Sequence, residues 1–157
     1  MGKRSVKENK TIYQLCREEA GLTREEASEI MDYISDDRIE RIENERSEIR
    51  PDEVIAMAQC YKNPNLCNYY CTHECPIGKE NVDVVEEKNL TQITLEILSD
   101  LNTLEKARNR FIEISADSKI TKDETRDFEE IKDHLENIAR SVDSLRLWIK
   151  NVELGEI

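Results

Sequence analysis

The sequence predicts an all-α protein in two parts, and three observations support this fold class. Glycine and proline, the residues that most disfavour helices, number only 4 and 3 among 157 residues. Hydrophobic residues make up 38% of the chain and charged residues 37%, so we expect a thin core and long helices. Apolar side chains recur every three or four residues along much of the chain, which is the period of an amphipathic helix.

The net charge and the cysteine content bear on which classes of function and which cellular compartment are expected. The net charge is −12, whereas nucleic-acid-binding proteins usually carry a basic surface. Residues 1–65 hold 11 basic and 15 acidic side chains (net −4), and residues 81–157 hold 11 and 18 (net −7), so neither part is basic. No signal peptide or membrane-spanning apolar run is apparent, and five cysteines without a secretion signal predict reduced thiols or a metal site. We therefore expect a cytoplasmic protein with no membrane partner.

Residues 1–10 are predicted to form a basic arm. They contain four lysines or arginines and a single glutamate. Such an arm is either a loose tail or a segment that touches DNA phosphates, and the composition leaves both interpretations open.

Residues 11–63 are predicted to fold into four short helices. Each helix after the first begins at a residue that caps helices, and Gly21 ends the first helix. The expected caps are the Thr23–Glu26 capping box, Ser35 and Pro51. The apolar side chains expected to face the core are Ile12, Leu15, Cys16, Ala20, Ala27, Ile30, Met31, Ile39, Ile42, Val54, Ile55, Met57, Ala58 and Tyr61.

The segments LCREEAGLTREEAS and DRIERIEN resemble the lambda-repressor-like, XRE-type helix-turn-helix family over about residues 11–62. The resemblance implies a DNA-binding module whose third helix is the recognition helix. It also implies a structural pair between Arg17 and Glu43, which would tie the first helix to the third. Proteins of this type usually bind pseudo-palindromic DNA as dimers.

The sequence departs from this family in the turns and in the recognition helix. The usual glycine between the second and third helices is missing, and Glu45 replaces the glycine that usually ends the recognition helix. Arg24 stands where a polar residue, usually glutamine, opens the second helix. The residues that the resemblance places at the DNA are Arg24, Asp36, Asp37, Arg38, Arg41 and Asn44.

Asp36 and Asp37 leave two interpretations of the third helix open. Acidic side chains in the first turn of a helix stabilise the helix dipole by about 0.3–1 kcal/mol each. The same carboxylates compete with a DNA phosphate for the helix N-terminus, although an aspartate can accept a hydrogen bond from cytosine. Arg41 is the best candidate for reading guanine. The third helix therefore either reads DNA or presents an acidic surface to a basic protein partner.

A cysteine cluster follows the fourth helix. Cys67, Cys71 and Cys75 are spaced four residues apart, so on one continuous helix they would share a face. Three thiols with either Cys60 or His73 make a ligand set for zinc or an iron–sulfur cluster, although the usual CxxC spacing is absent. The alternative is a group of small, buried apolar side chains.

Residues 82–157 are predicted to form two long helices in an antiparallel hairpin. The first helix would span about residues 82–115, and a capping box at Thr121–Glu124 would open the second. Apolar residues of the second helix step regularly by three and four from Phe128 to Val152, which is a heptad seam. Apolar surface beyond what two helices can cover implies a partner, most simply a second copy. The seam of this homodimer is assigned to Leu90, Ile97, Leu101, Leu135, Ile138, Val142 and Leu145.

The predicted order is a basic arm (1–10), a helix-turn-helix domain (11–63), a Cys-rich connector (64–81) and a coiled-coil hairpin (82–157). The predicted function is a sequence-specific DNA-binding transcriptional regulator that acts as a homodimer. The alternative is a helix-turn-helix-derived protein-interaction module that no longer binds DNA, with a metal-binding or redox-sensing cysteine cluster. No nucleophile–base pattern is evident, so we predict neither an enzyme nor a catalytic residue.

Overall fold

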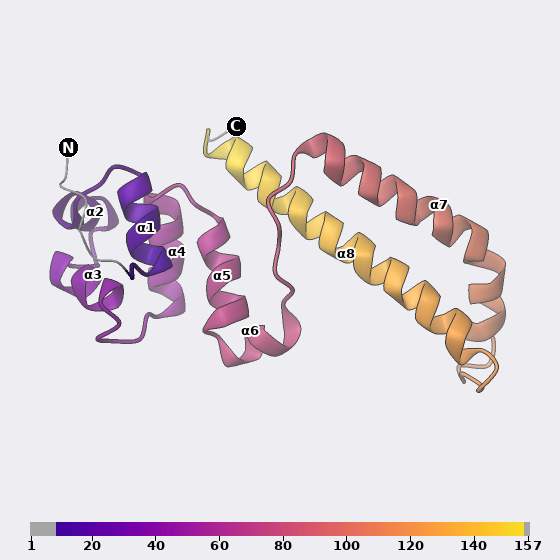
Figure 1. Cartoon of the computed structure of the whole chain (residues 1–157). Helices are drawn as coiled ribbons and strands as arrows, with labels where there is room; N and C mark the ends of the chain where they lie inside the picture. Colours follow the sequence, from indigo (N-terminus) through magenta and orange to yellow (C-terminus); the bar gives the residue numbers. More distant parts are fainter. Residues whose placement is uncertain (1–8, 156–157) are drawn as a thin grey trace. The chain divides into compact units, whose positions relative to one another are not determined.

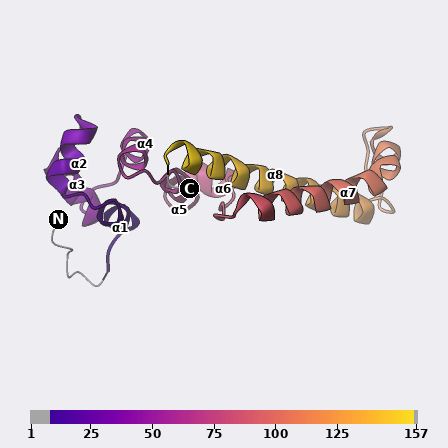
Figure 2. The same ribbon diagram turned by 90° about the horizontal axis from the view of Figure 1, so that it is seen from above.

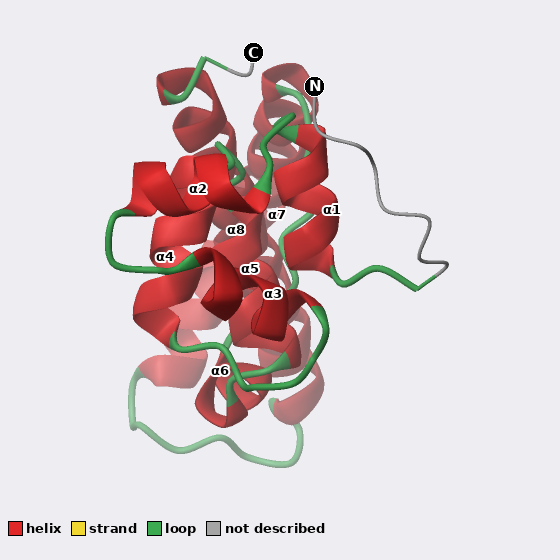
Figure 3. Ribbon diagram, turned by 90° about the vertical axis from the view of Figure 1, so that its left-hand side faces the viewer, coloured by secondary structure: helices red, strands yellow, loops and turns green. Residues whose placement is uncertain are grey.

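A computed structural model describes residues 9–155 and shows an all-α chain, as the composition predicted (Figure 1). Within these residues there is no strand, and loops alone join the helices (Figure 3). The helices are α1 (Ile12–Glu19), α2 (Arg24–Met31), α3 (Asp36–Glu43), α4 (Pro51–Cys60), α5 (Asn65–His73), α6 (Pro76–Asn81), α7 (Leu90–Ser115) and α8 (Thr125–Glu153). The chain divides into two compact units, residues 1–84 with 150–157 and residues 85–149. None of the helices in the described part is long and apolar enough to cross a membrane.

Local capping sets the starts of α2, α3 and α4 at the predicted residues. Thr23 Oγ1 accepts a hydrogen bond from the backbone N–H of Glu26 (3.1 Å), and the Glu26 carboxylate accepts one from the backbone N–H of Thr23 (2.7 Å). Ser35 caps α3 by accepting from the backbone N–H of Arg38, and Pro51 occupies the first turn of α4. These predicted helix starts are confirmed.

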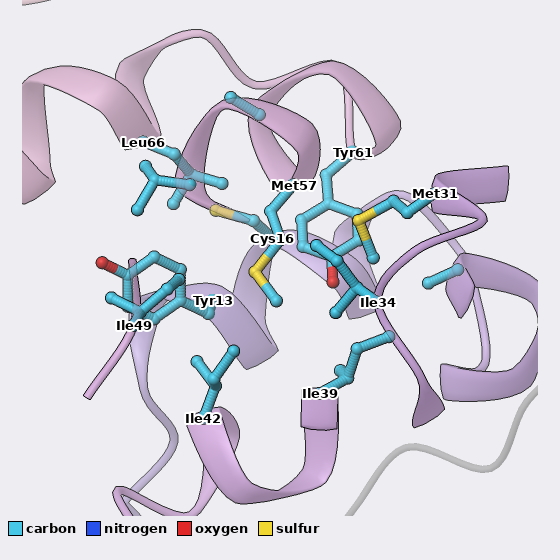
Figure 4. Close-up of a cluster of buried hydrophobic side chains, with 13 residues drawn as sticks. Tyr13, Cys16, Met31, Ile34, Ile39, Ile42, Ile49, Met57, Tyr61 and Leu66 are labelled. Atoms are coloured by element: carbon cyan, nitrogen blue, oxygen red, sulfur yellow. The ribbon is translucent and has the colours of Figure 1, made fainter. Parts of the chain in front are cut away.

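One hydrophobic core holds the first unit together, and residues from α1 to α5 contribute to it (Figure 4). Its buried side chains are Tyr13, Cys16, Ala27, Met31, Ile34, Ile39, Ile42, Ile49, Val54, Met57, Ala58, Tyr61 and Leu66. Leu66 comes from α5, which packs against α4 and α6. The segment predicted as a Cys-rich connector is therefore helical in this structure, and it adds a side chain to the core.

Several apolar side chains that we expected in the core are exposed. Leu15, Ile30 and Ile55 keep 40%, 60% and 53% of their surface accessible, and Ala20 lies beyond the end of α1. Each of the three larger residues is adjacent in the sequence to an apolar residue that is buried. Successive helical residues point about 100° apart, so where the core reaches only one of two adjacent positions, the other apolar side chain stays exposed. Those inward assignments are wrong for this reason.

The turns on either side of α3 contain carboxylate residues in a glycine-like backbone conformation. Asp32 has φ 61° and ψ −50°, and the backbone N–H of Tyr33 donates to the carbonyl of Met31 (2.7 Å), which closes a γ-turn. Glu45, just after α3, has φ 56°. A left-handed conformation costs a residue with a Cβ about 1–2 kcal/mol relative to glycine. In the two turns in which the family resemblance implied glycine, a residue with a side chain thus adopts a positive φ.

We expect Asp32→Gly to stabilise the first unit by about 1 kcal/mol, because glycine adopts a positive φ without steric conflict. Glu29→Gly is the matched control: Glu29 is an exposed residue inside α2, where glycine should destabilise the unit by about 1 kcal/mol. Urea unfolding followed by amide resonances of the first unit measures both. Equal destabilisation by the two substitutions would show that Asp32 is not strained.

In the second unit, α7 and α8 lie antiparallel beside each other, as two perpendicular views agree (Figures 1 and 2). The predicted helical hairpin is confirmed. The predicted start of its first helix is wrong, because residues 82–89 are not helical in this structure. α7 begins at Leu90, where Asn89 caps it by accepting a hydrogen bond from the backbone N–H of Gln92 (2.9 Å). Asparagine at this position is a stronger start signal than the apolar residues that precede it.

The hairpin of α7 and α8 contains both buried apolar side chains and polar contacts between the two helices. Ile93, Ile114 and Ile131 are buried, with at most 3% of their surface accessible. Halfway along the hairpin, Nδ1 of His134 on α8 lies 2.9 Å from a carboxylate oxygen of Asp100 on α7. This contact shows that Asp100 of α7 lies opposite His134 of α8.

The heptad of α8 is only partly covered by α7. Leu135, Ile149 and Val152 remain 42%, 42% and 40% exposed. On α7, Leu98 and Leu101 are 52% and 47% exposed. A single neighbouring helix covers one stripe of apolar residues, so the rest of the repeat lies outside the contact between the two helices.

Candidate nucleic-acid interface

The two faces of α3 differ in burial and in chemistry. Ile39, Ile42 and Glu43 point into the first unit and are buried. Asp37 and Arg41 are exposed, and because they lie four residues apart they share the outer face. This outer face is the surface that α3 can offer to a partner.

A buried ion pair joins α1 to α3. Nε and Nη2 of Arg17 donate to the two carboxylate oxygens of Glu43 at 2.5 and 2.9 Å, and Nη1 donates to the carbonyl of Leu22 (2.7 Å). Burial alone would lower the pKa of Arg17, but the hydrogen bond and the charge of Glu43 outweigh it and raise the pKa above its ordinary value. The pair that the family resemblance implied is present, and it holds α3 against α1.

Arg24, which we predicted at a DNA phosphate, shares this carboxylate. Its Nε donates to Glu43 at 2.8 Å from the start of α2. The Arg24 side chain is 32% exposed, whereas that of Glu43 is inaccessible to solvent. Glu43 therefore links three helices. A phosphate contact by Arg24 stays a prediction. The Arg24 guanidinium would have to bind the phosphate through nitrogens other than the Nε that donates to Glu43.

Arg38, also predicted at the DNA, has a structural role that the sequence did not reveal. Its guanidinium donates to both carboxylate oxygens of Glu53 (2.7 Å each), to Ser47 Oγ (2.5 Å) and to the carbonyl of Glu48 (2.7 Å). Burial alone would raise the pKa of Glu53, but hydrogen bonds from Arg38 and from the backbone N–H of Arg50 bring it below its ordinary value. Arg38 thus ties α3 to α4. No local signal in the sequence pointed to this contact, because Glu53 lies 15 positions from Arg38.

Arg41 is the cation on the outer face of α3. It is exposed and, among the residues that the structure describes, it forms no ion pair. Asn44 Nδ2 donates to the carbonyl and to Oε1 of Glu40 (2.8 Å each), and Arg46 Nη1 lies 3.3 Å from the same carboxylate. Of the three arginines predicted to contact DNA, Arg41 is therefore the one whose side chain is engaged least by the protein itself.

Asp36 and Asp37 occupy the first turn of α3 and are exposed. Together with Glu40 they give the first five residues of α3 three carboxylates. Their position at the N-terminus suits the stabilisation of the helix dipole. Their negative charge also repels a phosphate backbone. A base contact by either aspartate stays a prediction.

The basic arm predicted at residues 1–10 lies almost entirely outside the described residues. Lys10 is described, and its Nζ pairs with Glu18 at 2.6 Å. A phosphate contact by the arm stays a prediction.

The cysteines after α4 do not share one helix face, and that expectation is wrong. α5 carries Cys67 and Cys71 but ends at His73. Cys75 has an extended backbone, as expected for a residue before proline, and is the N-cap of α6. Its Sγ accepts a hydrogen bond from the backbone N–H of Gly78 (3.4 Å). The chain thus turns between the second and third thiols of the cluster.

Within residues 9–155, no group of three or more cysteine, histidine or acidic side chains is arranged to hold a metal ion. Burial raises the pKa of the Cys60 and Cys67 thiols, which disfavours the thiolate that binds metals. Both side chains pack against the hydrophobic core. The geometry therefore favours packed thiols at Cys60 and Cys67 over the alternative, a zinc or iron–sulfur site at Cys67, Cys71 and Cys75 with either Cys60 or His73.

Comparison with known proteins finds a match for the region of the first four helices. A family model described as Helix-turn-helix matches residues 14–64, which include α2, α3, α4 and most of α1. No curated protein and no solved structure matches the chain significantly. The match ends just before α5, so it covers the part of the first unit in which the Arg17–Glu43 pair and Arg41 lie.

Proposed function

We propose that this helix-turn-helix protein is a transcriptional regulator that binds a specific DNA sequence as a homodimer. The helix-turn-helix match over residues 14–64 supports a role of the DNA-binding regulator type. The observation that carries the proposal is the exposed Arg41 on the outer face of α3. An arginine can donate two hydrogen bonds to guanine O6 and N7, which favours that base by about 1–3 kcal/mol.

Two ion pairs support this reading, because they fix the helix that carries Arg41. Glu43 connects α3 to Arg17 of α1, and Arg38 connects α3 to Glu53 of α4. A recognition residue on a helix that is held from both sides loses little conformational freedom when it binds. Arg17 and Arg38 therefore contribute to recognition by fixing the position of α3.

The hairpin supplies a surface for the second copy. Leu101 directly follows Asp100 on α7, and Leu135 directly follows His134 on α8, while Asp100 and His134 are in contact. In an antiparallel helix pair, one step along each helix turns both side chains toward the same side. Leu101 and Leu135 thus lie on one face of the hairpin.

The homodimer seam that we propose is centred on this face. Of its residues, Leu90, Leu101 and Leu135 are exposed, and Ile97, Ile138, Val142 and Leu145 are half-buried. Packing two hairpins through such a face would form a four-helix bundle. It would also place two copies of α3 in one assembly, as a two-fold symmetric DNA site requires.

Selection from a randomised duplex library by the intact chain tests the proposal. We expect enrichment of a two-fold symmetric motif. Arg41→Ala should then weaken binding to the selected site by about 1–3 kcal/mol. The matched control is Arg126→Ala, because Arg126 is an exposed arginine on α8, and that substitution should leave DNA affinity unchanged. Binding to random DNA decides nothing, because residues 1–65 carry a net charge of −4.

The absence of a selected DNA motif is the result that would count against the proposal. No enrichment at low salt, even with Asp36→Gln and Asp37→Gln removing the repulsion, would contradict DNA binding. It would favour the second candidate, a protein-interaction module. The observation behind that candidate is the group of three carboxylates, Asp36, Asp37 and Glu40, which would face a basic partner protein.

A further inference from the structure

An open cavity of about 490 Å³ lies in the first unit. Side chains from residues 9–13, 42–49 and 69–74 line it, so it lies between the start of α1, the loop after α3 and the end of α5. Ile12, Ile42 and Ile49 give it apolar walls. Figure 4 shows Ile42 and Ile49 beside Tyr13 at one edge of the core. A volume of this size is in the range of small-molecule sites.

Aromatic rings form another wall of the cavity. The rings of Tyr69 and His73 are stacked, with centroids 4.3 Å apart and planes at 11°. Tyr13 meets Tyr69 edge to face, with centroids 6.4 Å apart. His73 is exposed and Tyr69 is half-buried, and both line the cavity, so the stack contributes aromatic surface to it. Flat, partly exposed aromatic platforms bind planar groups and cations.

The polar lining is acidic. Glu45, Glu48 and Glu74 line the cavity, and Lys10 is the lysine or arginine among the described lining residues. The Lys10 ammonium lies 2.6 Å from the carboxylate of Glu18, which is not part of the lining. The charge of Lys10 is therefore offset by a neighbour, and the three glutamates leave the cavity negative.

A hydrogen bond within the protein orients the carboxylate of Glu74. The hydroxyl of Tyr13 donates to Glu74 Oε1 at 2.9 Å, a contact between α1 and the end of α5. Burial and the neighbouring carboxylate raise the pKa of Tyr13, so its hydroxyl stays a donor. The hydrogen bond engages one carboxylate oxygen and orients the other, which can still accept from a ligand.

We propose that this cavity binds a small organic cation in which a flat apolar body carries an amidinium, guanidinium or ammonium group. The apolar body would lie between the isoleucine walls and the Tyr69–His73 stack, and the charged group would face Glu74. An anion is disfavoured by the three glutamates. This proposal does not depend on DNA binding, because neither Arg41 nor the outer face of α3 takes part.

Isoleucine-methyl resonances of the full chain provide the test, with benzamidine as the probe. We expect saturable shifts for Ile12, Ile42 and Ile49, with Ile131 of the second unit as the unaffected reference. Benzamide has nearly the same shape but no charge, so it should bind about tenfold more weakly. Benzoate should not bind measurably.

Glu74→Gln should weaken benzamidine binding by about tenfold. A glutamine oxygen still accepts the hydrogen bond of Tyr13, so the substitution removes charge with little change in packing. Glu29→Gln on α2 is the charge-matched control and should leave the affinity unchanged. Absence of saturable shifts with benzamidine would overturn the proposal. Equal affinities for benzamidine and benzamide, or equal losses in the two variants, would overturn it as well.

Discussion

Replacing Glu43 by glutamine should lower the free energy of unfolding of the first unit by about 3–5 kcal/mol. Glu43 is fully buried and accepts hydrogen bonds from Arg17 and Arg24 at 2.5–2.9 Å. The substitution removes the negative charge of Glu43. The guanidinium of Arg17 then remains in a site where the Arg17 side chain is only 8% exposed, without a counter-charge. The effect is large because a buried charge without a partner costs far more than a lost surface pair.

Urea unfolding followed by amide resonances of the first unit measures this loss. Glu25→Gln is the control, because Glu25 is exposed on α2 and the change should stay within about 0.5 kcal/mol. The double variant Arg17→Met, Glu43→Leu should recover part of the stability, since two apolar side chains replace both charges together. A loss below about 1 kcal/mol for Glu43→Gln would show that the network does not hold α3 in place.

Replacing Leu101 by glutamate should convert the intact chain from a dimer into a monomer at micromolar concentration. Leu101 is 47% exposed on the face of the hairpin that it shares with Leu135, and the dimer seam that we propose is centred there. A carboxylate inside an apolar seam in each of two copies would be desolvated without a partner. The hairpin itself should remain folded, because the substituted side chain is half exposed in the single chain.

Sedimentation analysis of the intact chain tests this result, and Leu95→Glu provides the matched control. Leu95 lies on the same helix and is 63% exposed, but it is six residues from Leu101 and therefore on another side of α7. The dimer should survive that substitution. A wild-type chain that sediments as a monomer would contradict the proposed seam, and equal disruption by both variants would place the interface elsewhere.

Signals that act over a few residues could be read from the sequence. Thr23 with Glu26, Ser35 and Pro51 set the starts of α2, α3 and α4, because a cap acts on the backbone of the next turn alone. The apolar period was sufficient to predict the two long helices as an antiparallel hairpin. The pairing of Arg17 with Glu43 followed from a family resemblance, since the two residues are 26 positions apart in the sequence and no local signal connects them.

Only the tertiary structure decided how charged side chains at the candidate site are used. Arg38 and Arg41 are three residues apart on α3, and nothing local distinguishes them. The position of α4 brings Glu53 to Arg38, 15 residues away, and leaves Arg41 on the outer face. The predicted single face for the cysteines failed for a related reason, because α5 ends before Cys75.

The same distinction applies to burial and to the cavity. The apolar period showed that α1, α2 and α4 are amphipathic, but which of two adjacent apolar residues lies inside depends on where neighbouring helices pack. The cavity is an extreme case, because its walls come from three segments, residues 9–13, 42–49 and 69–74, that meet only in the folded unit. The sequence by itself determined the helical fold class, the starts of α2, α3 and α4, and the hairpin, since these depend on short-range backbone and periodicity effects. Ion-pair partners, inward faces and the cavity depend on contacts between residues far apart in the chain, and those contacts exist only once the helices have packed.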